Sequence, residues 1–392
     1  MNDVVIASAA RTAIGSYGKS RSGVPPSELG AIATVAALER AGIEASEVER
    51  VVFGNVIHTE PGDMYMARVV GMKAGIPQEV PAYTVNRLCG TGVQAIVSAT
   101  QAIQTGEASV AVAGGAESMS RGPYWNPSAR WGARMGEAEL VDPVMGGLTD
   151  PFHSILMGVT AENLAQRNSI SRERQDEFAL QSHRRAAAAR EEGRFAAQIV
   201  PVPVRFKRET VEFAADEHIR ADASPKQLAK LKPVFKADGT VTAGNASGMN
   251  DAGAAVVLMS AARAQELGAP VRARVLAYAS CGVDPEIMGI GPVPAVRKVL
   301  ERSGVSLDDV QLIELNEAFA AQALAVIDEL GLDEDRVNPN GGAIALGHPI
   351  AATGAAITAK LLDEMERRDL ELGLVTLCIG GGQGIALLLG RE

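Results

Sequence analysis

Aromatic residues and cysteine are scarce in this sequence. Phe, Trp and Tyr make up 4% of its 392 residues, so a core within the 47% hydrophobic content must rely on Ala, Val, Ile and Leu. The three cysteines, Cys89, Cys281 and Cys378, are too few and too scattered for a disulfide framework. We therefore expect free thiols and a reducing, cytoplasmic setting.

Signals for membranes, secretion and nucleic acid are missing as well. No stretch offers the roughly 18 uninterrupted apolar residues of a membrane span, and residues 1–15 lack the basic segment of a secretory signal. The net charge of −10 disfavours nucleic acid, because such a partner requires a basic face. We expect neither a membrane nor a nucleic-acid partner.

One stretch, residues 220–236 (RADASPKQLAKLKPVFK), runs against the acidic balance. It holds five basic residues and a single acid, Asp222. The stretch is either a solvated helix face or a local anion site suited to a phosphorylated small molecule.

Strand-like and helix-like segments alternate from residue 1 to about 118 and again after about 250. This alternation favours parallel βαβ units, and the length favours two or three folded units. The two halves echo each other, which indicates an internal duplication. Residues between them are irregular apart from a polar helix, as in an inserted loop domain. The predicted division is 1–118 with 250–269, then 119–249, then 270–392.

Four chemically capable side chains fall where a strand gives way to a turn or a helix. We expect Cys89 to open a helix, where the helix dipole lowers a thiol pKa. Asn316 and His348 are expected to be N-caps, and Cys378 ends a strand at a glycine-rich turn. Each alone could be a buried cysteine, a simple cap or a local hydrogen-bonding residue. Their shared position at the carboxyl ends of strands favours a joint active site.

Two other kinds of site are disfavoured. The glycines of residues 380–384 (GGGQG) do not match G-x-G-x-x-G, and no helix follows them, which argues against NAD. The five histidines show no metal-ligand spacing with cysteine or carboxylates, so no metal is expected.

Six motifs stand in the order and spacing found in thiolases, over residues 4 to 390. They are NRLCGTG (86–92), GGAESMS (114–120), GTVTAGNASGMNDAG (239–253), NEAFAAQA (316–323), NGGAIALGHP (340–349) and CIGGGQG (378–384). The chain resembles the biosynthetic acetyl-CoA acetyltransferases, especially the bacterial β-ketothiolases that supply polyhydroxyalkanoate synthesis. The resemblance implies a five-layered αβαβα fold of two duplicated α/β domains with an inserted loop domain. It also implies a homotetramer (a dimer of dimers), and coenzyme A thioesters as substrates without a tightly bound cofactor.

The resemblance also implies roles for the reactive residues. Cys89 is the nucleophile that takes an acyl group from acyl-CoA, and His348 activates it. His348, with a water held by Asn316, stabilises the enolate oxygen of the second thioester. Cys378 moves a proton on and off the substrate α-carbon, and the N–H groups of Cys89 and Gly380 bind the oxygen of the acyl-enzyme.

The implied coenzyme A contacts lie mostly in the loop domain. They comprise the pantetheine-tunnel residues Met157, Ser247, Ala318 and Phe319, then Arg220 near the nucleotide, and further Leu231, Phe235, Ala243 and Met249. Three residues depart from the usual pattern: Leu156 stands for a histidine, Gln227 for a serine and Ala351 for a glycine. We expect retained chemistry with altered affinity or chain-length selectivity.

The expected activity is the reversible conversion of two acetyl-CoA into acetoacetyl-CoA and CoA through an acyl-cysteine. Alternatives are a broader 3-ketoacyl-CoA thiolase working in thiolysis, a Cys-His-Asn acyl hydrolase, and a non-catalytic acyl-CoA carrier. A hydrolase leaves Cys378 unexplained, and a carrier has no need of all four residues. The related ketoacyl synthases use two histidines beside the cysteine, and Cys378 argues against them.

Overall fold

The computed structural model describes residues 2–20, 22–206 and 209–391. The N-terminal half comprises β1 (Val4–Thr12), β2 (Gly15–Ser16), α1 (Pro26–Ala41), β3 (Arg50–Gly54), α2 (Met66–Lys73), β4 (Ala82–Val85), α3 (Thr91–Gln104), β5 (Val110–Ser118), β9 (Asn250–Ser260) and α8 (Ala261–Leu267). The C-terminal half comprises β10 (Ala273–Gly282), α9 (Pro292–Ser303), β11 (Leu312–Leu315), α10 (Ala320–Leu330), α11 (Ala343–Leu346), α12 (Ile350–Arg367), β12 (Leu372–Ile379) and β13 (Gln383–Gly390). The alternation expected from the sequence is therefore present in both halves.

The strand pairings repeat between the halves. In the described part of the chain, the long strands form one sheet in the order β11-β12-β13-β10-β1-β9-β5-β3-β4. On one side β1–β9 and β9–β5 are antiparallel while β5–β3 and β3–β4 are parallel. On the other side β10–β13 and β13–β12 are antiparallel, β12–β11 is parallel, and a parallel bridge joins Ile313 to Val337. The repeated order supports the inferred duplication, although the sheet is mixed rather than parallel throughout.

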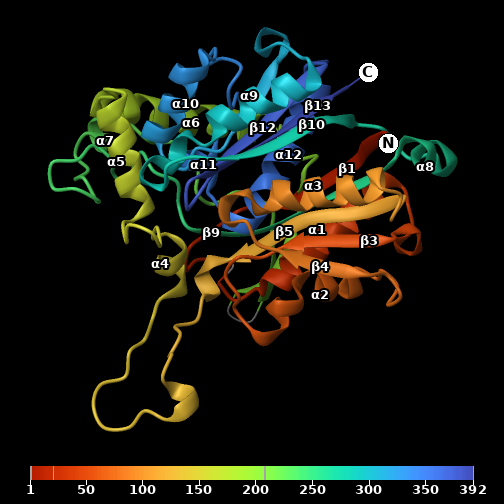
Figure 1. Cartoon of the computed structure of the whole chain (residues 1–392), viewed down its shortest axis with the longest axis horizontal. Coiled ribbons are helices and arrows are strands. Elements are labelled where there is room, and N and C mark those ends of the chain that lie inside the picture. Colours follow the sequence, from red (N-terminus) through yellow and green to blue (C-terminus); the bar gives the residue numbers. More distant parts are fainter. Residues whose placement is uncertain (1, 21, 207–208, 392) are drawn as a thin grey trace.

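Helices and half-sheets stack in five layers (Figure 1). Helices α1 and α2 cover the outer face of the N-terminal half-sheet, and α9 and α10 cover that of the C-terminal half-sheet. Helices α3 and α12 lie between the half-sheets and contact strands of both. Antiparallel pairing of β1 with β10 joins the half-sheets. The αβαβα arrangement expected from the resemblance is confirmed.

Glycines allow the two central helices to touch at their N-terminal ends. A Cβ placed on Gly92 of α3 would lie 2.6 Å from the backbone N of Ala355, and one on Gly354 of α12 would lie 2.4 Å from that of Val93. Such distances exclude any side chain at either position. The contact brings the turn before α3 next to the turn before α12, and these turns carry Cys89 and His348.

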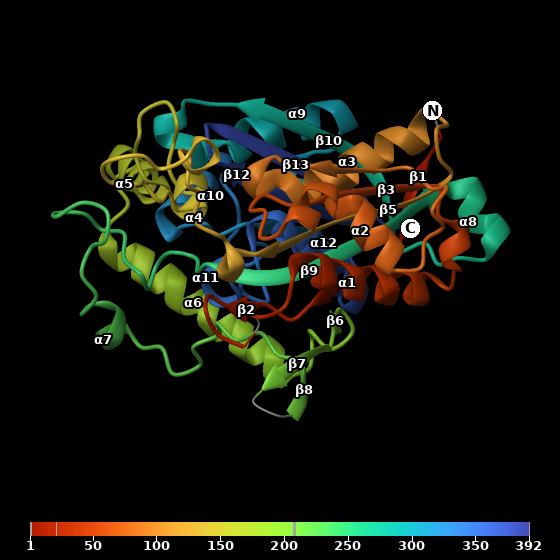
Figure 2. The same ribbon diagram turned by 90° about the horizontal axis from the view of Figure 1, so that it is seen from below.

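The residues between β5 and β9 form the remaining elements. These are α4 (Pro143–Gly147), α5 (Met157–Arg167), α6 (Arg172–Glu191), β6 (Ile199–Val200), β7 (Val202–Phe206), β8 (Glu209–Phe213) and α7 (Pro225–Leu228). They gather along one side of the layered body (Figure 2), and a long loop, residues 122–142, extends away from it (Figure 1). The exact domain boundaries stay a prediction.

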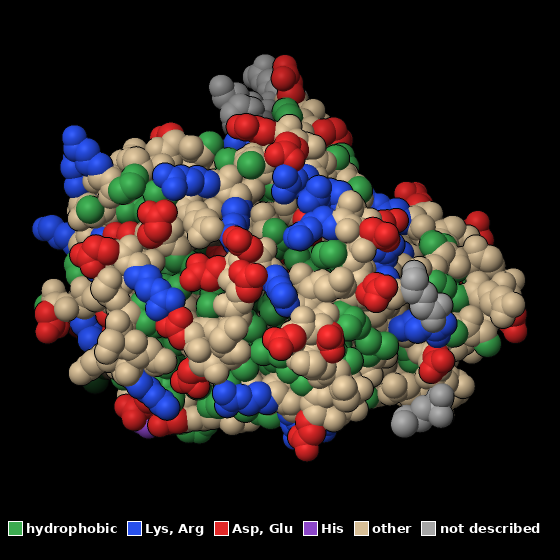
Figure 3. All heavy atoms as spheres, turned by 90° about the horizontal axis from the view of Figure 1, so that it is seen from above, with side chains coloured by type: hydrophobic (Ala, Val, Ile, Leu, Met, Phe, Trp, Pro, Cys, Tyr) green, Lys and Arg blue, Asp and Glu red, His purple; other side chains and the backbone are tan. Residues whose placement is uncertain are grey.

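The surface and the helices bear on possible partners. On the face drawn in Figure 3, Lys and Arg side chains are interspersed with Asp and Glu. Such a face does not offer the continuous basic surface that binds a nucleic-acid backbone. None of the described helices combines the length and apolar character that crossing a bilayer requires.

Candidate active site

Cys89 lies in a tight turn, Leu88–Gly90, between β4 and α3. Helix α3 begins two residues later than the sequence predicted, at Thr91. Leu88 has a φ of 45°, a left-handed conformation that is uncommon for a residue other than glycine. Gly90 permits the close packing of this turn on β12, because a Cβ there would lie 2.4 Å from Cδ1 of Ile379.

The expectation that the helix start lowers the pKa of Cys89 is wrong. Burial raises the pKa of this thiol to about 11, although the backbone N–H groups of Gly380 and of Cys89 itself act in the opposite direction. The charge of Glu117 raises it slightly further. Desolvation outweighs these N–H groups, and among the described residues no cationic side chain lowers the pKa of this thiol. The two N–H groups that reach the sulfur are the pair expected to bind the oxygen of an acyl-enzyme.

Cys378 is fully buried at the penultimate position of β12. Burial raises the pKa of its thiol, and the charge of Cys89 raises it further, so the two sulfurs lie close enough to interact. Cys378 packs in an apolar cluster with Met157, Met288, Ala318 and Phe319. A Cβ on Gly380, two residues further on, would lie 3.4 Å from the sulfur of Met157. The predicted residues 89, 157, 318, 319, 378 and 380 therefore share one region.

The hydrogen bonds of Thr353 indicate the tautomer of His348. The hydroxyl of Thr353 donates its only hydrogen to the carbonyl oxygen of Pro349 at 3.0 Å. The same oxygen lies 2.6 Å from Nδ1 of His348, and because its hydrogen is used at Pro349 we assign this oxygen as the acceptor of the contact. Nδ1 therefore carries the proton, and Nε2 is a hydrogen-bond acceptor. Nε2 is buried and makes no hydrogen bond to any described residue.

His348 is neutral and held from two sides. Burial lowers the pKa of its imidazole to about 4, and its backbone N–H donates to Oδ1 of Asn250 at 2.9 Å. The N-cap of α12 is Pro349, one residue later than predicted, because the chain at His348 is extended beside Met249. A neutral imidazole with a free acceptor nitrogen can remove a proton from a nearby thiol.

Asn316 presents an unsatisfied carboxamide. Its backbone N–H donates to the carbonyl oxygen of Thr376 at 3.0 Å, but Oδ1 and Nδ2 are buried without a partner among the described residues. The prediction that it caps a helix is wrong, since α10 begins at Ala320 with Phe319 as N-cap. The side chain of Glu317 anchors the segment between β11 and α10 by accepting from Ser182 and Asn338. The carboxamide is thus free to bind a water or a substrate oxygen.

Several of the predicted coenzyme A residues contact Ala318 and Phe319, which pack with Cys378. Ser247 donates its N–H to the carbonyl oxygen of Ala318 at 3.0 Å. The rings of Phe235 and Phe319 meet edge to face, with 6.0 Å between centroids and 87° between planes. Three segments that are distant in sequence therefore meet next to Cys378.

Three further predicted coenzyme A residues, Met249, Leu231 and Ala243, make contacts of their own. Met249 forms a parallel bridge with His348. Leu231 packs on the turn that carries the exposed Ala243, since a Cβ on Gly244 would lie 2.5 Å from Leu231 Cδ1. These contacts join residue 231 to the turn that carries residue 243, residues 235 and 247 to residues 318–319, and residue 249 to the backbone of His348.

Arg220 interacts with two histidines, His183 and His218, and His218 lies next to Gly248. Its backbone N–H donates to Nδ1 of His183 in α6 at 3.2 Å. Burial, and then the charge of Arg220, lowers the pKa of His218 to about 4. The His218 ring fills the space where a Cβ of Gly248 would be. The segment 220–236 is helical only at Pro225–Leu228, so the helix-face interpretation of its basic residues is wrong.

Sequence reasoning missed several residues around the site. Met288 and Thr353 contact Cys378 and His348, and Glu117 interacts with Cys89. Met288 follows β10 at the same sheet edge, and Glu117 lies inside a quoted motif, so both carried a signal. Thr353 could be assigned only from its hydrogen bonds.

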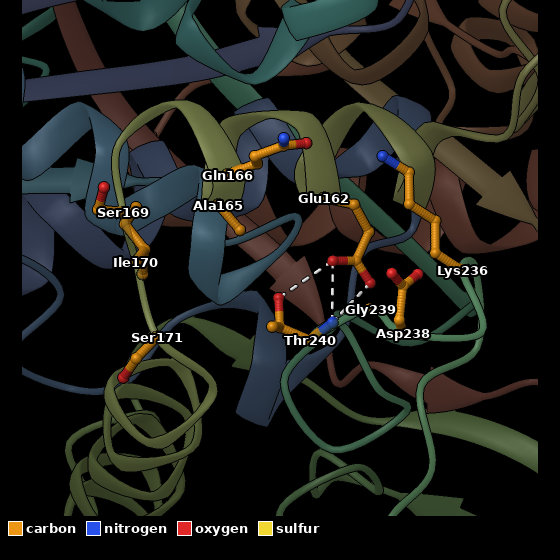
Figure 4. A pocket seen from close by; sticks show the side chains of 10 residues that line it. All are labelled: Glu162, Ala165, Gln166, Ser169, Ile170, Ser171, Lys236, Asp238, Gly239 and Thr240. Carbon is orange, nitrogen blue, oxygen red and sulfur yellow. Dashed lines mark hydrogen bonds between the residues drawn. The ribbon is translucent and has the colours of Figure 1, made fainter.

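A pocket of about 460 Å³ lies elsewhere, beside the C-terminal half of α5 (Figure 4). Glu162 points across it and accepts hydrogen bonds from the N–H groups of Thr240 and Val241 at 2.9 and 2.8 Å. Neither thiol nor the imidazole lines it. Among the described residues, no group of His, Cys, Asp or Glu is arranged to hold a metal.

Comparison with known proteins identifies the family. The thiolase N-terminal domain model matches residues 4–262, and the thiolase C-terminal domain model matches residues 269–391. The chain is 57% identical over 390 residues to the beta-ketothiolase BktB of Cupriavidus necator, covering 99% of both chains. It is 54% identical over 394 residues to an acetyl-CoA acetyltransferase of Pseudomonas aeruginosa, with 100% of both covered.

Solved structures agree with the sequence comparison. The Bacillus anthracis acetyl-CoA acetyltransferase superposes with a TM-score of 0.98 at 49% identity, covering 100% of this chain and 99% of that one. Human mitochondrial 3-ketoacyl-CoA thiolase in complex with CoA superposes with a TM-score of 0.97 at 44% identity, covering 100% and 98%. The two domain matches and the full-length identity, together with the five-layered fold, show that the chain belongs to the thiolase family.

Proposed function

We propose that the protein is an acetyl-CoA C-acetyltransferase that joins two acetyl-CoA into acetoacetyl-CoA and CoA, reversibly. The convergence of Cys89, Cys378 and the acceptor nitrogen of His348 supports this most directly. Identity above 50% to a beta-ketothiolase and to an acetyl-CoA acetyltransferase supports the same reaction. Coenzyme A thioesters are then substrates, and no resident cofactor takes part.

The first half-reaction forms an acyl-enzyme. The Cys89 sulfur attacks the thioester carbon of acetyl-CoA while Nε2 of His348 takes the thiol proton. The carbonyl oxygen becomes negative and accepts from the N–H groups of Cys89 and Gly380, a type of interaction worth about 3–4 kcal/mol in a transition state. The bond to CoA breaks, and Cys378 gives its proton to the departing sulfur. Acetyl-Cys89 remains a thioester, so the acyl group stays activated.

The second half-reaction forms the carbon–carbon bond. The Cys378 thiolate removes a proton from the methyl carbon of a second acetyl-CoA. The imidazolium at Nε2, with a water bound by the Asn316 carboxamide, stabilises the enolate oxygen. The enolate carbon attacks acetyl-Cys89, the C–S bond breaks, and His348 returns its proton to the Cys89 sulfur. Cys89, His348 and Cys378 are then back in their starting protonation states, and the proton taken from the methyl carbon has replaced the one that left with CoA.

Four bulky or packed side chains around Cys378 favour short acyl groups. Met157, Met288, Ala318 and Phe319 enclose the sulfur in one cluster, which leaves little room for a long acyl chain. A broader 3-ketoacyl-CoA thiolase is the second candidate, supported by the likeness to human mitochondrial 3-ketoacyl-CoA thiolase.

The line of residues from 231 to 249 is proposed to carry the pantetheine arm, with Arg220 near the nucleotide. Apolar residues 231, 235 and 319 suit the alkyl parts of the arm. The exposed positive charges at 220, 226, 230 and 232 suit phosphate groups. The anion-site interpretation of residues 220–236 therefore belongs to this proposal.

We also propose a homotetramer working in the cytoplasm. The loop of residues 122–142 exposes Tyr124, Trp125, Trp131, Met135 and Leu140. β4 ends the sheet with one unpaired edge beside the exposed Met64 and Tyr65. Two separate exposed apolar regions fit two different contacts between copies, as a dimer of dimers needs. Three free cysteines suit a reducing compartment.

Cysteine substitutions test the reaction. In Cys89→Ala we expect kcat for thiolysis of acetoacetyl-CoA to fall at least about a thousandfold, because the nucleophile is gone. In Cys378→Ala condensation is lost as well, but residue 89 still accumulates an acetyl group detectable by peptide mass spectrometry. Cys281→Ala, on β10, is the matched control and should stay within about twofold of the wild type. Release of free acid and CoA without acetoacetyl-CoA would identify a hydrolase, and binding without turnover a carrier.

Chain length separates the two thiolase candidates. We expect kcat/KM for thiolysis to be highest with acetoacetyl-CoA and to fall as the 3-ketoacyl chain lengthens, because Met288 packs in the cluster around Cys378. In Met288→Ala the longer substrates should gain relative to acetoacetyl-CoA. A flat profile in the wild type would favour the broader enzyme.

The pH dependence of Cys89 alkylation tests the neutral thiol–imidazole pair. With a pKa of about 11 for Cys89 and about 4 for His348, both groups are uncharged at neutral pH. The thiolate fraction then rises about tenfold per pH unit between pH 7 and 10, and the iodoacetamide rate at residue 89 should follow it. A plateau between pH 5 and 8 would instead reveal a thiolate–imidazolium pair.

The oligomer is tested by mass. Light scattering should give four times the chain mass of 40.8 kDa. The double variant Trp131→Ser, Met135→Ser removes two exposed apolar side chains from the extended loop and should yield dimers. A wild-type monomer, or a variant that remains tetrameric, would contradict the assignment of this loop.

A further inference from the structure

Glu117 is a fully buried acidic side chain that takes no part in the proposed steps. It stands at the penultimate position of β5. Its Oε1 accepts from Nδ2 of Asn55 and from the N–H of Ile57, each at 3.0 Å, and its Oε2 accepts from the N–H of Ala351 at 3.0 Å. Within the described residues, no lysine or arginine forms an ion pair with it.

One oxygen of Glu117 caps the helix that follows His348. The first N–H groups of a helix lack partners inside it, and the N-cap of α12, Pro349, provides no side-chain acceptor. The Oε2 atom supplies that acceptor from another element, at the helix end where a negative charge is favoured. The first turn of α12 is also pressed on β5, because a Cβ on Gly115 would lie 2.0 Å from the carbonyl oxygen of Ala351.

The other oxygen, Oε1, binds the segment around Ile57, which packs beside Cys89. Ile57, whose N–H donates to Oε1, packs in an apolar cluster with Ile350 and the partly buried Cys89. Ile350 is the first residue of α12. One carboxylate therefore bonds both to the segment that packs on the nucleophile and to the helix that follows the imidazole.

We propose that Glu117 is a positioning residue. It fixes the segment around Ile57, which packs beside Cys89, relative to the first turn of α12, which follows His348, and it places a negative charge near the Cys89 sulfur. The inference rests on the proposed function for its kinetic consequence but not for its electrostatic one. The charge of Glu117 raises the pKa of Cys89, and burial raises the pKa of Glu117 itself to about 8. Glu117 is thus charged above that pH.

Glu117→Gln removes the charge at nearly constant shape. A carboxamide can accept at one end only, so either the Ala351 N–H or the Ile57 N–H loses its acceptor. We expect kcat to fall about 10- to 100-fold, as for a small misplacement of reacting groups, with KM within about threefold. Alkylation of Cys89 by iodoacetamide at pH 9 should become faster than in the wild type, because the opposing charge is gone.

Two further variants separate charge from position. Glu117→Asp keeps the charge but withdraws the oxygens by one methylene, so kcat should fall without faster alkylation at pH 9. Glu162→Gln is the matched control, because Glu162 also clamps backbone N–H groups from a buried site, beside the α5 pocket (Figure 4). It should leave the alkylation rate of Cys89 unchanged.

The outcomes against the inference are distinct. Unchanged kcat in Glu117→Gln, or alkylation at pH 9 no faster than in the wild type, would overturn it. An equal acceleration in Glu162→Gln would show a general loosening of the fold. If Glu117→Gln does not fold, full kcat in Glu117→Asp would overturn the positioning role. A wild-type protein without thiolase turnover would refute the proposed function alone, since the alkylation comparison does not depend on turnover.

Discussion

The contact between Gly92 and Gly354 is the constraint on which the site depends. It lets α3 and α12 touch at their N-terminal ends, between two half-sheets that each belong to a different half of the chain. The turns that precede these helices carry Cys89 and His348, and β12, which packs on the first of them, carries Cys378. Helix and strand ends therefore meet at one place for a steric reason, and the reactive side chains meet because they sit on those ends.

The same convergence explains the electrostatics. Cys378 and His348 are buried at this meeting point and Cys89 is partly buried, and burial disfavours the charged form of each group. The thiol of Cys89 and the imidazole of His348 are consequently both neutral at rest. The proposed thioester exchange suits such a pair, since in that proposal the thiol proton would move to Nε2 only when the sulfur attacks. A permanent thiolate would favour reaction with other electrophiles and oxidants.

Much of this arrangement could be predicted from the sequence. Alternating apolar patterns placed the strands and helices of both halves, and the position of Cys89, Asn316, His348 and Cys378 after strands placed them at one sheet edge. The details near each residue could not be predicted. Asn316 lies in a segment that Ser182 and Asn338 anchor through Glu317, and α10 begins only at Ala320. The pKa of Cys89 is raised because burial exceeds the effect of the backbone N–H groups of Gly380 and Cys89. Both depend on contacts between residues far apart in the chain, which local patterns do not record. The role of Thr353 likewise depends on a single hydrogen-bond count.

Two departures from the expected family pattern, Ala351 and Leu156, lie in different surroundings. Ala351 lies in the first turn of α12, with its N–H on Glu117 and its carbonyl oxygen against Gly115. In a helix, alanine is favoured over glycine by about 0.5–1 kcal/mol, so it stiffens the turn after His348 without entering the cluster around Cys378. Leu156 directly precedes Met157, which does belong to that cluster. An apolar side chain there replaces one that could hydrogen-bond. Any change in acyl preference is therefore to be sought at Leu156, and any change in the rigidity of the imidazole at Ala351.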